Sequence, residues 1–401
     1  MTTPDAVALG DVAAFVRGIT FKPDDLVPVG TTGAAACMRT KNVQTELDLS
    51  DIWGIPESFV RRDDQYLLPD DILVSSANSW NLVGKCCKVP RLPWRATFGG
   101  FISVLRANPA KVEPRYLFRW FASDRTQAIV RSFGQQTTNI SNLNVDRCLK
   151  LKLHLPPPSE QQRIAKILDK ADALRAKRRT ALAQLDTFTH SIFLDMFGDP
   201  ATNPKGWPTR RLDAVCGLVN GRAFKPAEWE EDGLPIIRIQ NLNDAKKPFN
   251  YTTQSLPERF RVRPGDILFS WSGTPGTSFG CFRWSGPEGW LNQHIFNVRL
   301  NGALQGDYFI AHVNLKLVEL IAKAHGGVGL QHVTKGMVDE TMLMVPPTHL
   351  QVEFARRVAR VEKLAADQQA ALVSLDSLFA ALQHRAFRGE LVRDEVDEVV
   401  V

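Results

Sequence analysis

The 401-residue sequence lacks the features that mark membrane, zinc-binding and disulfide-rich proteins. No stretch approaches the roughly 18 to 20 continuous apolar residues that cross a bilayer, and the opening MTTPDAVALGDV has neither a basic region nor an apolar core. We therefore expect a soluble cytoplasmic protein that makes no membrane contact. Its six cysteines show no CxxC spacing, so we expect reduced, mostly buried thiols rather than a metal site or a disulfide framework.

Catalytic motifs are missing as well. NPKGW (203–207) differs from the Asn-Pro-Pro-aromatic motif of adenine methyltransferases at its second proline, and the Pro69-Asp70 pair is followed by no (D/E)xK in residues 71–100. The histidines have no HExxH spacing, and no Walker-type or GxGxxG phosphate loop occurs. We therefore expect a non-catalytic chain that holds no metal and no cofactor of its own.

Charge is distributed unevenly along a mildly basic chain of net charge +6. Residues 1–84 hold 6 Lys and Arg against 12 Asp and Glu, whereas residues 85–152 hold 13 against 3. A region of this kind attracts a polyanion, because phosphate contacts release counterions. The alternative is a solvated surface that only balances the acidic first stretch in space.

A repeat of 190 residues organises the chain. LPPPSEQQRIAKILDK begins at Leu155, and VPPTHLQVEFARRVAR begins at Val345. Under this constant shift the matches are Gln161 with Gln351, Ala165 with Ala355, Leu174 with Leu364, ALAQLD (181–186) with ALVSLD (371–376), and Phe197 with Phe387. Such self-similarity indicates duplicated structure.

The segments before the two helical repeats also match each other. LGDVAAFVRGITFKP (9–23) resembles LDAVCGLVNGRAFKP (212–226), and LPDDILVSS (68–76) resembles RPGDILFSW (263–271), where an acidic turn precedes a strand. The order is therefore globular domain, long helix, globular domain, long helix. We expect these elements, followed by an acidic tail, at residues 1–155, 156–198, 199–345, 346–390 and 391–401.

Prolines 156–158 set the entry into the first long helix. They hold the chain extended and prevent an earlier helix start. Ser159 and Gln162 fit a capping box, which predicts that the helix begins there and runs to Gly198. About 38 residues at about 1.5 Å per residue give a rod on the order of 57 Å.

Both helical segments follow a heptad pattern, which favours a coiled coil between them. The predicted contact positions are the first set Ile164, Ala171, Arg178, Leu185 and Ile192, the second set Ile167, Leu174, Ala181, Phe188 and Asp195, and their repeats 190 residues later, among them Leu364, Leu375 and Leu378. The heptads leave the helix direction open. If it is antiparallel, Arg178 and Gln368 would form a polar layer that fixes register; the alternative is that each helix packs only on its own domain.

PPPSEQQRIAKILDKADALRAKRR, MFGDPATNPKGWP, NQHIF and VPP together resemble the DNA-specificity (S) subunit of type I restriction-modification systems over essentially the whole chain. The resemblance implies a mixed α/β (α+β) fold. It would contain two target recognition domains, joined by two long helices in an antiparallel coiled coil as a pseudo-twofold repeat.

The same resemblance implies partners and a task. Each domain would recognise one half of a bipartite double-stranded DNA target, with the helices as the ruler between them. Two methyltransferase subunits would bind this chain, and restriction/translocase subunits would join them. S-adenosylmethionine, ATP and magnesium would then belong to those partner subunits.

The second copy departs from the pattern in two places. Thr348, His349, Leu350 and Gln351 stand where the first copy has Ser-Glu-Gln-Gln, so the cap is degraded. NQHIF of the second domain faces only FGGFI (98–102) in the first. Roles therefore do not transfer automatically from one half to the other.

Base recognition needs Arg, Asn, Gln and aromatic side chains on exposed loops. The candidates lie in 75–85, 134–142, 270–278, 292–295 and 326–335, with basic residues nearby. They are Asn78, Trp80, Asn81, Lys85, Arg91, Arg95, Gln135, Gln136, Asn139, Arg222, Lys225, Ser272, Thr274, Gln293, His294, Gln331, His332 and Lys335. For each of them the alternative is an ordinary turn, and for Asn292 to His294 it is a hydrogen-bonded role in the domain core.

Three other functions stay open on the sequence. A coiled-coil scaffold between two protein-binding domains predicts no salt-dependent DNA affinity, and a self-contained enzyme predicts methyl transfer by the chain alone. The third keeps the same two-domain architecture in a different methyltransferase or restriction system.

Overall fold

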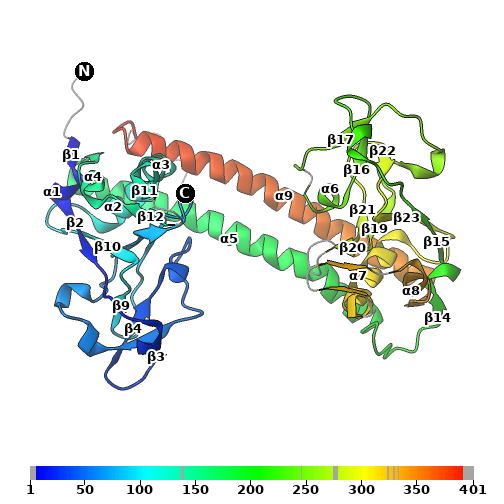
Figure 1. Ribbon diagram of the computed structural model, residues 1–401, viewed down its shortest axis with the longest axis horizontal. Coiled ribbons are helices and arrows are strands. Elements are labelled where there is room, and N and C mark those ends of the chain that lie inside the picture. Colours follow the sequence, from blue (N-terminus) through cyan, green and yellow to red (C-terminus); the bar gives the residue numbers. More distant parts are fainter. Residues whose placement is uncertain are drawn as a thin grey trace. The chain divides into compact units, whose positions relative to one another are not determined.

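The computed structural model describes residues 6–136, 140–244, 246–273, 279–322, 325–327, 330–332 and 334–391. The chain forms two compact units. Unit 1 comprises Met1–Lys177 and Ala371–Val401, and unit 2 comprises Arg178–Ala370. Each unit therefore contains one globular domain and half of each long helix (Figure 1).

Unit 1 contains short strands and helices whose order follows the sequence. They are β1 (Ala6–Ala8), α1 (Leu9–Val12), β2 (Ala13–Arg17), β3 (Val27–Pro28), β4 (Ala34–Met38), β5 (Trp53–Pro56), β6 (Ile72–Ser75), β7 (Ala77–Asn78), β8 (Cys86–Lys88), β9 (Ala96–Phe98), β10 (Ile102–Ala107), α2 (Pro114–Phe121), α3 (Asp124–Ser132), β11 (Gly134–Gln136), β12 (Ser141–Leu143), α4 (Val145–Leu149) and β13 (Lys152–His154).

Unit 2 repeats this plan. Its elements are β14 (Thr209–Arg211), β15 (Cys216–Asn220), β16 (Leu234–Ile237), α6 (Ile239–Asn243), β17 (Asn250–Thr252), β18 (Arg261–Val262), β19 (Ile267–Ser270), β20 (Ser272–Gly273), β21 (Gly280–Arg283), β22 (Gly289–Leu291), β23 (Ile295–Leu300), α7 (Gly306–Ala322), β24 (His325–Gly327), β25 (Leu330–His332), α8 (Lys335–Asp339) and β26 (Met342–Met344).

The sheets of the two units correspond one to one. The order β2-β10-β6-β8 in unit 1 matches β15-β23-β19-β21 in unit 2, and β11-β12-β7 matches β24-β25-β20. Each unit also has a sheet that contains one parallel pair, β4 with β9 and β16 with β22. The internal repeat predicted from the sequence is therefore confirmed, and the fold is mixed α/β.

The long helices are α5 (Pro158–Phe197) and α9 (Thr348–Ala386). Their ends differ by one to four residues from the predicted segments 156–198 and 346–390. Helix α5 begins at Pro158, so Ser159 lies in the first turn and is not the cap that the capping box with Gln162 predicted. Proline suits the first helical position because the missing N–H would have no helical partner there.

A buried glutamine ties each long helix to its own domain. Gln161 accepts a hydrogen bond from the Glu113 amide (2.8 Å) and donates one to the Pro156 carbonyl (2.7 Å). Its repeat, Gln351, accepts from the Gln305 amide (2.7 Å) and donates to the Pro346 carbonyl (2.8 Å). The glutamine next to the predicted cap therefore anchors the proline entry in both copies.

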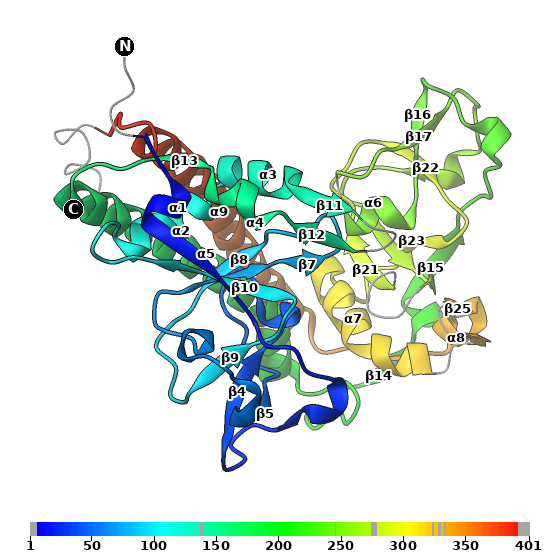
Figure 2. The same ribbon diagram turned by 60° about the vertical axis from the view of Figure 1, so that its left-hand side comes forward.

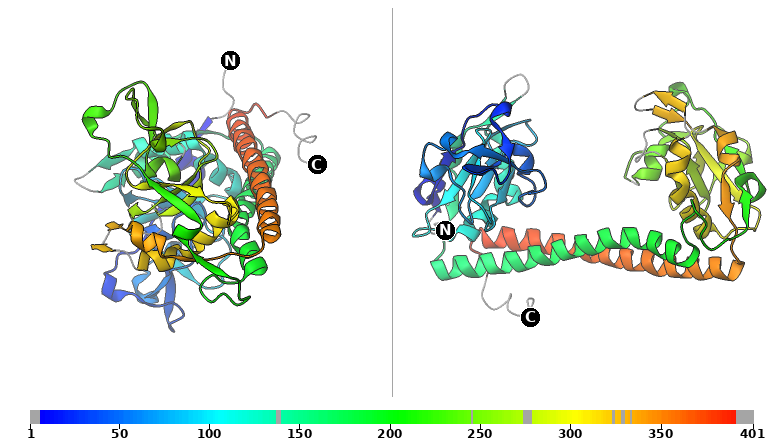
Figure 3. Two further views of the ribbon diagram at one scale, coloured as in Figure 1. Left: turned by 90° about the vertical axis from the view of Figure 1, so that its right-hand side faces the viewer. Right: turned by 90° about the horizontal axis from the view of Figure 1, so that it is seen from below.

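The two long helices run in opposite directions within each unit (Figure 3). In unit 1, Arg163 donates to the Leu391 carbonyl (2.9 Å), and Arg175, further along α5, pairs with the earlier Asp376 (2.6 Å). In unit 2, Arg178 donates to Gln368, and the Phe193 ring packs edge-on to Phe354 at 5.7 Å. The predicted contact between Arg178 and Gln368 is thus present.

The heptad prediction was wrong for part of the helix contact. The first set is buried or half-buried, as are Ile167 and Leu375, but four second-set residues are exposed: Leu174 by 51%, Phe188 by 54%, Leu364 by 46% and Leu378 by 37%. The buried partners instead lie four residues after the first set, at Leu168, Leu372 and Phe379. Arg175 belongs to the same series. Its side chain is charged, but ion pairs compensate this charge in the fold.

Candidate nucleic-acid interface

The structure joins the two recognition segments that the sequence nominated in the first domain. Strand β12 pairs with β7, with Ser141 opposite Asn78, and with β11, where Asn142 lies opposite Gln135 (Figure 2). Residues about 60 positions apart thus form one small sheet, which we call the tip sheet of unit 1. Asn139 lies outside the described residues, as does the side chain of Gln136.

The turn after β7 presents an aromatic ring. Trp80 is 54% exposed. Asn78 donates to the Ser75 hydroxyl (3.0 Å) and accepts from the Ser79 amide (2.8 Å), while Asn81 accepts from the Ser79 hydroxyl (2.7 Å). The asparagines therefore shape the turn, and Trp80 is the side chain that this turn leaves open to a ligand.

The basic candidates of unit 1 have partners of differing strength. Lys85 donates to Gln44 (2.6 Å), and Arg95 pairs with Glu57 (2.9 Å) while its guanidinium lies 3.9 Å from the centroid of the Tyr66 ring. Arg91 is exposed. Arg95 directly precedes β9, which belongs to the sheet β3-β5-β4-β9, so it lies on a different sheet from Asn78.

Unit 2 brings its nominated segments together in the same way. Strand β20 pairs with β25, with Ser272 opposite His332, and β25 pairs with β24, which forms the tip sheet of unit 2. Ser272 is buried. Thr274 lies outside the described residues, as do the side chains of Gln331 and His332.

Gln293 and His294 adjoin this tip sheet. Their side chains approach to 2.9 Å, and the His294 ring packs edge-on against Trp271, with centroids 5.5 Å apart. Trp271 is the residue between β19 and β20. The segment 292–295 is therefore in contact with the segment 270–278.

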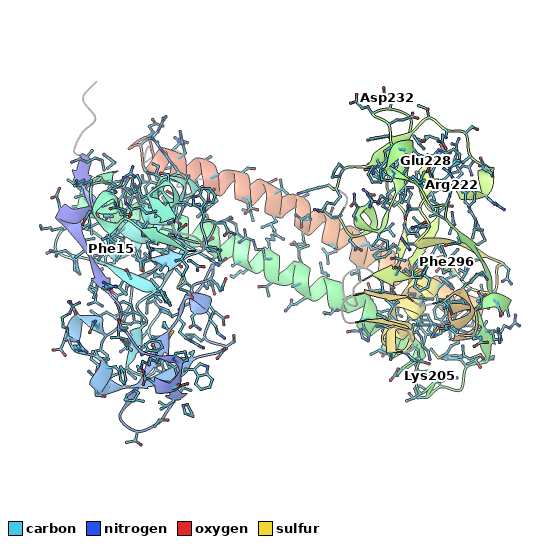
Figure 4. The ribbon with its side chains drawn as sticks, in the orientation of Figure 1. Phe15, Lys205, Arg222, Glu228, Asp232 and Phe296 are labelled. Carbon is cyan, nitrogen blue, oxygen red and sulfur yellow. The ribbon has the colours of Figure 1, made fainter. Side chains whose placement is uncertain are left out.

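Arg222 and Lys225 lie on a neighbouring loop (Figure 4 labels Arg222 and Glu228). Arg222 pairs with Glu228, donates to Gln254 (3.3 Å) and lies 4.9 Å from the Phe224 ring centroid. The backbone amide of Lys225 and the Arg222 guanidinium lower the pKa of the Glu228 carboxyl. Lys225 is exposed, which leaves its ammonium on the surface.

Lys335 is placed on a helix rather than on a loop. It is the first residue of α8, and its ammonium pairs with Asp339 one turn later (2.6 Å). The preceding Thr334 caps this helix by accepting from the Met337 amide. Lys335 therefore lies beside the tip sheet with its charge already compensated.

A close backbone approach explains a glycine that occurs in both copies of the repeat. A Cβ at Gly18 would lie 2.3 Å from the Gly99 carbonyl oxygen, and one at Gly221 would lie 2.0 Å from that of Asn292. Only glycine permits such an approach. The turn that starts β10 or β23 is thus held against the loop after β2 or β15.

Phe101, which this turn presents, was not among the predicted DNA-binding residues. Phe101 is 63% exposed, and its carbonyl accepts from the amides of Ser76 (3.0 Å) and Ala77 (3.1 Å) at the start of β7. It takes the position of His294, because β10 and β23 begin at the next residue in each unit. Aligning GGFI (99–102) with NQHI (292–295) would have nominated it.

The thiols are not reactive groups. All six cysteines are free, and five are buried. Burial raises the pKa of Cys37 and of Cys87 to about 12, so both are protonated near neutral pH. Among the described residues, no group of three or more His, Cys, Asp and Glu side chains could hold a metal ion. Within the same residues, no helix is long and apolar enough to cross a membrane.

The chain thus contains two copies of one α/β domain, each with a polar and aromatic tip sheet and each joined to a long helix. The sequence profile of the type I restriction modification DNA specificity domain matches residues 4–185 and 204–372. The chain belongs to this family.

Individual relatives span nearly the whole chain. The chain is 24% identical to the type I restriction enzyme EcoKI specificity subunit of Escherichia coli K12 and 23% identical to the StySPI specificity subunit of Salmonella potsdam; each match covers 95% of this chain and 87% of the relative. A chain in a solved structure of a type I R-M system has a similar fold, with a TM-score of 0.60 at 17% identity over 98% of this chain and 100% of the other.

Proposed function

We propose that this chain is the DNA-reading specificity subunit of a type I restriction-modification system and that it recognises a bipartite double-stranded DNA target. The observation that carries the proposal is the duplicated turn beside each tip sheet, which presents different side chains at equivalent positions. Phe101 in unit 1 corresponds to His294 in unit 2. Two similar readers with different contact chemistry suit an asymmetric target in two parts.

The chemistry of each tip suits base contacts. Amide and imidazole side chains hydrogen-bond to base edges, and exposed aromatic rings stack on bases or wedge between them. Trp80 and Phe101 supply the rings in unit 1, and Gln293 and His294 supply the polar groups in unit 2. Residues 85–152 carry 10 more positive than negative charges; Arg95 and Arg119 are paired with acids, and the exposed Arg91 would supply phosphate attraction.

We infer that α5 and α9 form an antiparallel coiled coil that separates the two readers and relates them by a pseudo-twofold axis. Helix α5 has 40 residues, which corresponds to about 60 Å at about 1.5 Å per residue. Half-sites approached from one face of DNA lie about 34 to 36 Å apart, so the helices together with the domains have sufficient reach.

The partners would dock on the exposed apolar residues of the helices. Leu174 and Leu378 are exposed in unit 1, and their repeats Leu364 and Phe188 are exposed in unit 2. Two equivalent apolar sites suit two copies of one partner, which we propose are methyltransferase subunits; restriction/translocase subunits would join that complex. Methylation with S-adenosylmethionine and cleavage with ATP and magnesium would occur in those partners, and this chain would be non-catalytic.

Genome-wide mapping of modified adenines tests the function. The chain is co-expressed with the methyltransferase subunit encoded beside it, and modified sites are compared with those from cells that express the methyltransferase alone. The expected result is one bipartite motif that appears only with this chain. A short continuous motif would contradict two separate readers, and no new modification would contradict the proposal itself.

DNA affinity gives an independent check. The purified chain should bind duplex DNA that carries the motif, and the logarithm of the binding constant should fall linearly with the logarithm of salt concentration. Salt-independent binding, or no binding at low salt, would instead favour a protein scaffold.

A further inference from the structure

Unit 2 has a cavity beside the long helices. Its volume is about 340 Å³, and it lies between α5, α7 and α9. Ile310, Leu315 and Val358 line it with apolar groups, and Glu362, Asp307 and Arg283 bring charges. All of these residues belong to unit 2, so the cavity is formed within one unit.

The repeat identifies the matching residues of unit 1. Helix α7 follows α2 with a shift of 192, because the Tyr116 hydroxyl donates to the His154 carbonyl (2.7 Å) and the Tyr308 hydroxyl to the Met344 carbonyl (3.0 Å). The long helices follow a shift of 190. Ala311 therefore corresponds to Arg119, Ala365 to Arg175, and Glu362 to Asp172.

In unit 1, arginine side chains occupy this place. Arg119 pairs with Asp169 (2.7 Å) and with Asp172 (2.7 Å). Arg175 pairs with Asp172 (2.9 Å), and its guanidinium lies 4.2 Å from the Phe379 ring centroid. The carboxylate of Asp172 is thus shared by two guanidinium groups that lie on apolar neighbours.

In unit 2, alanines replace both arginines while the carboxylate is kept. Burial, and then the nearby Asp307 charge, raise the pKa of the Glu362 carboxyl. Arg283, the cation that opposes this shift, is bound to Asp307 (2.6 Å). Among the described residues Glu362 forms no ion pair of its own. The cavity therefore has room for one cation that the chain does not supply.

We infer that this cavity binds one guanidinium or primary ammonium group carried on an apolar stem, with Glu362 as the charge partner and Ile310 and Val358 as the walls of the stem. The group takes the place that Arg119 fills in unit 1. The inference does not depend on the proposed function. The cation comes either from a side chain of a docked protein subunit or from a small diffusible amine or guanidine.

The test uses n-butylguanidinium as the probe on the full chain, with methyl NMR of Ile310, Leu315 and Val358 as the readout. N-butylurea, which has nearly the same shape without the charge, is the matched ligand. The expected result is saturable shifts of these methyl groups in the millimolar range with n-butylguanidinium only. No shifts, or equal shifts with N-butylurea, would overturn the inference.

Variants locate the contact. Glu362→Gln should weaken probe binding at least about tenfold, because it removes the charge-assisted hydrogen bonds. Ala311→Arg should abolish binding by filling the cavity from within. Glu353→Gln removes a half-buried acid of the same helix that already pairs with Arg356 and Arg357, and it should change nothing. Unchanged affinity in Glu362→Gln would overturn the assignment.

The reciprocal variant tests the equivalence of the two units. Arg119→Ala should open the matching place in unit 1, and n-butylguanidinium, but not N-butylurea, should restore part of the lost melting temperature. Absence of this rescue would contradict the equivalence. In the complex with the methyltransferase, displacement of the probe from unit 2 identifies a protein side chain as the source, and continued binding identifies a diffusible cation.

Discussion

His312 is a buried histidine, and its surroundings disfavour the protonated, charged form of the ring. It is fully buried on α7 against the rings of Phe193 and Tyr308, each with its centroid 5.5 Å away. Neither ring nitrogen has a hydrogen-bond partner among the described residues. Burial, and then the Lys316 charge, lower the pKa of His312 to about 3. Trp120, the residue at the matching position of α2, is a buried ring without this liability.

We therefore predict that unit 2 loses stability as the pH falls from about 6.5 towards 3. The unfolded chain protonates His312 in this window and the folded chain does not, so the free energy of unfolding falls by about 1.4 kcal/mol per pH unit, or about 2 kcal/mol between pH 6.5 and 5. Urea unfolding of wild type and His312→Leu at both pH values measures the difference. His190→Leu, an exposed control, should keep the wild-type slope; an unchanged slope in His312→Leu would contradict the prediction.

A substitution of Phe101 gives the most direct test of the DNA-reading proposal. Phe101→Ala should weaken binding to the cognate duplex by about tenfold, because stacking of a base on an aromatic ring is worth roughly 1–3 kcal/mol. The melting temperature should not change, since the ring is exposed and its carbonyl contacts are retained. Titration of a labelled duplex measures the affinity, and Phe101→Trp should rescue it; wild-type affinity in Phe101→Ala would remove this residue from the interface.

The sequence predicted the segments that come together at each tip, but it did not predict the role of each side chain. Asn78 and Asn81 were nominated for base contacts because amides bind adenine, yet both are used within their own turn. Phe101 was overlooked because a lone apolar residue near glycines carries no signal. Exposure depends on which other segments cover a residue, and local sequence does not contain that information.

At the scale of elements, Arg178 and Gln368 form a polar contact between the two long helices near mid-length. We predict that replacing Arg178 and Gln368 together by leucine leaves the fold intact and loosens helix alignment, because apolar layers tolerate several registers whereas a hydrogen-bonded pair selects one. Electron-spin distances between labels on α5 and α9 of unit 2 should broaden. An unchanged distance distribution with an unchanged unfolding transition would mean that register is set elsewhere.

The exposed apolar residues of the helices give a second prediction at this scale. Leu174→Glu with Leu378→Glu should reduce the bound methyltransferase from two copies to one, because the equivalent residues in unit 2 remain intact. Phe188→Glu with Leu364→Glu should do the same through unit 2, and all four changes should abolish binding. Mass measurement of the complex gives the stoichiometry; two bound copies in the fourfold variant would exclude this surface.

The molecule as a whole joins its domains to the helices in two chemically different ways. In unit 1, Arg115, Arg119 and Arg175 pair with Asp169, Asp172 and Asp376. In unit 2 the places of Arg119 and Asp172 hold Ala311 and Glu362, and a neighbouring aromatic cluster of Phe193, Phe197, Tyr308 and Phe354 joins the domain to the helices. Charge pairs weaken with added salt, whereas apolar contacts do not.

We predict that about 1 M salt, where the screening length is about 3 Å, loosens the junction of unit 1 first. Hydrogen exchange should accelerate at 165–176 and remain unchanged at 190–197. Sodium sulfate against sodium chloride separates screening from changes in the hydrophobic effect. Equal acceleration in both segments would contradict the difference between the junctions.

The repeat, the two long helices and their proline entries could be predicted from the sequence, because these follow from spacing and from local backbone chemistry. Which heptad positions are buried depends on contacts in the fold: Leu174 and Arg175 are neighbours, and the ion pair with Asp376 turns the arginine inward and the leucine outward. The tertiary structure also determines that β7 and β12 belong to one sheet. In unit 1, Arg119 fills the place that is open beside Ala311 in unit 2. These features depend on partners distant in the chain, whose positions no local pattern specifies.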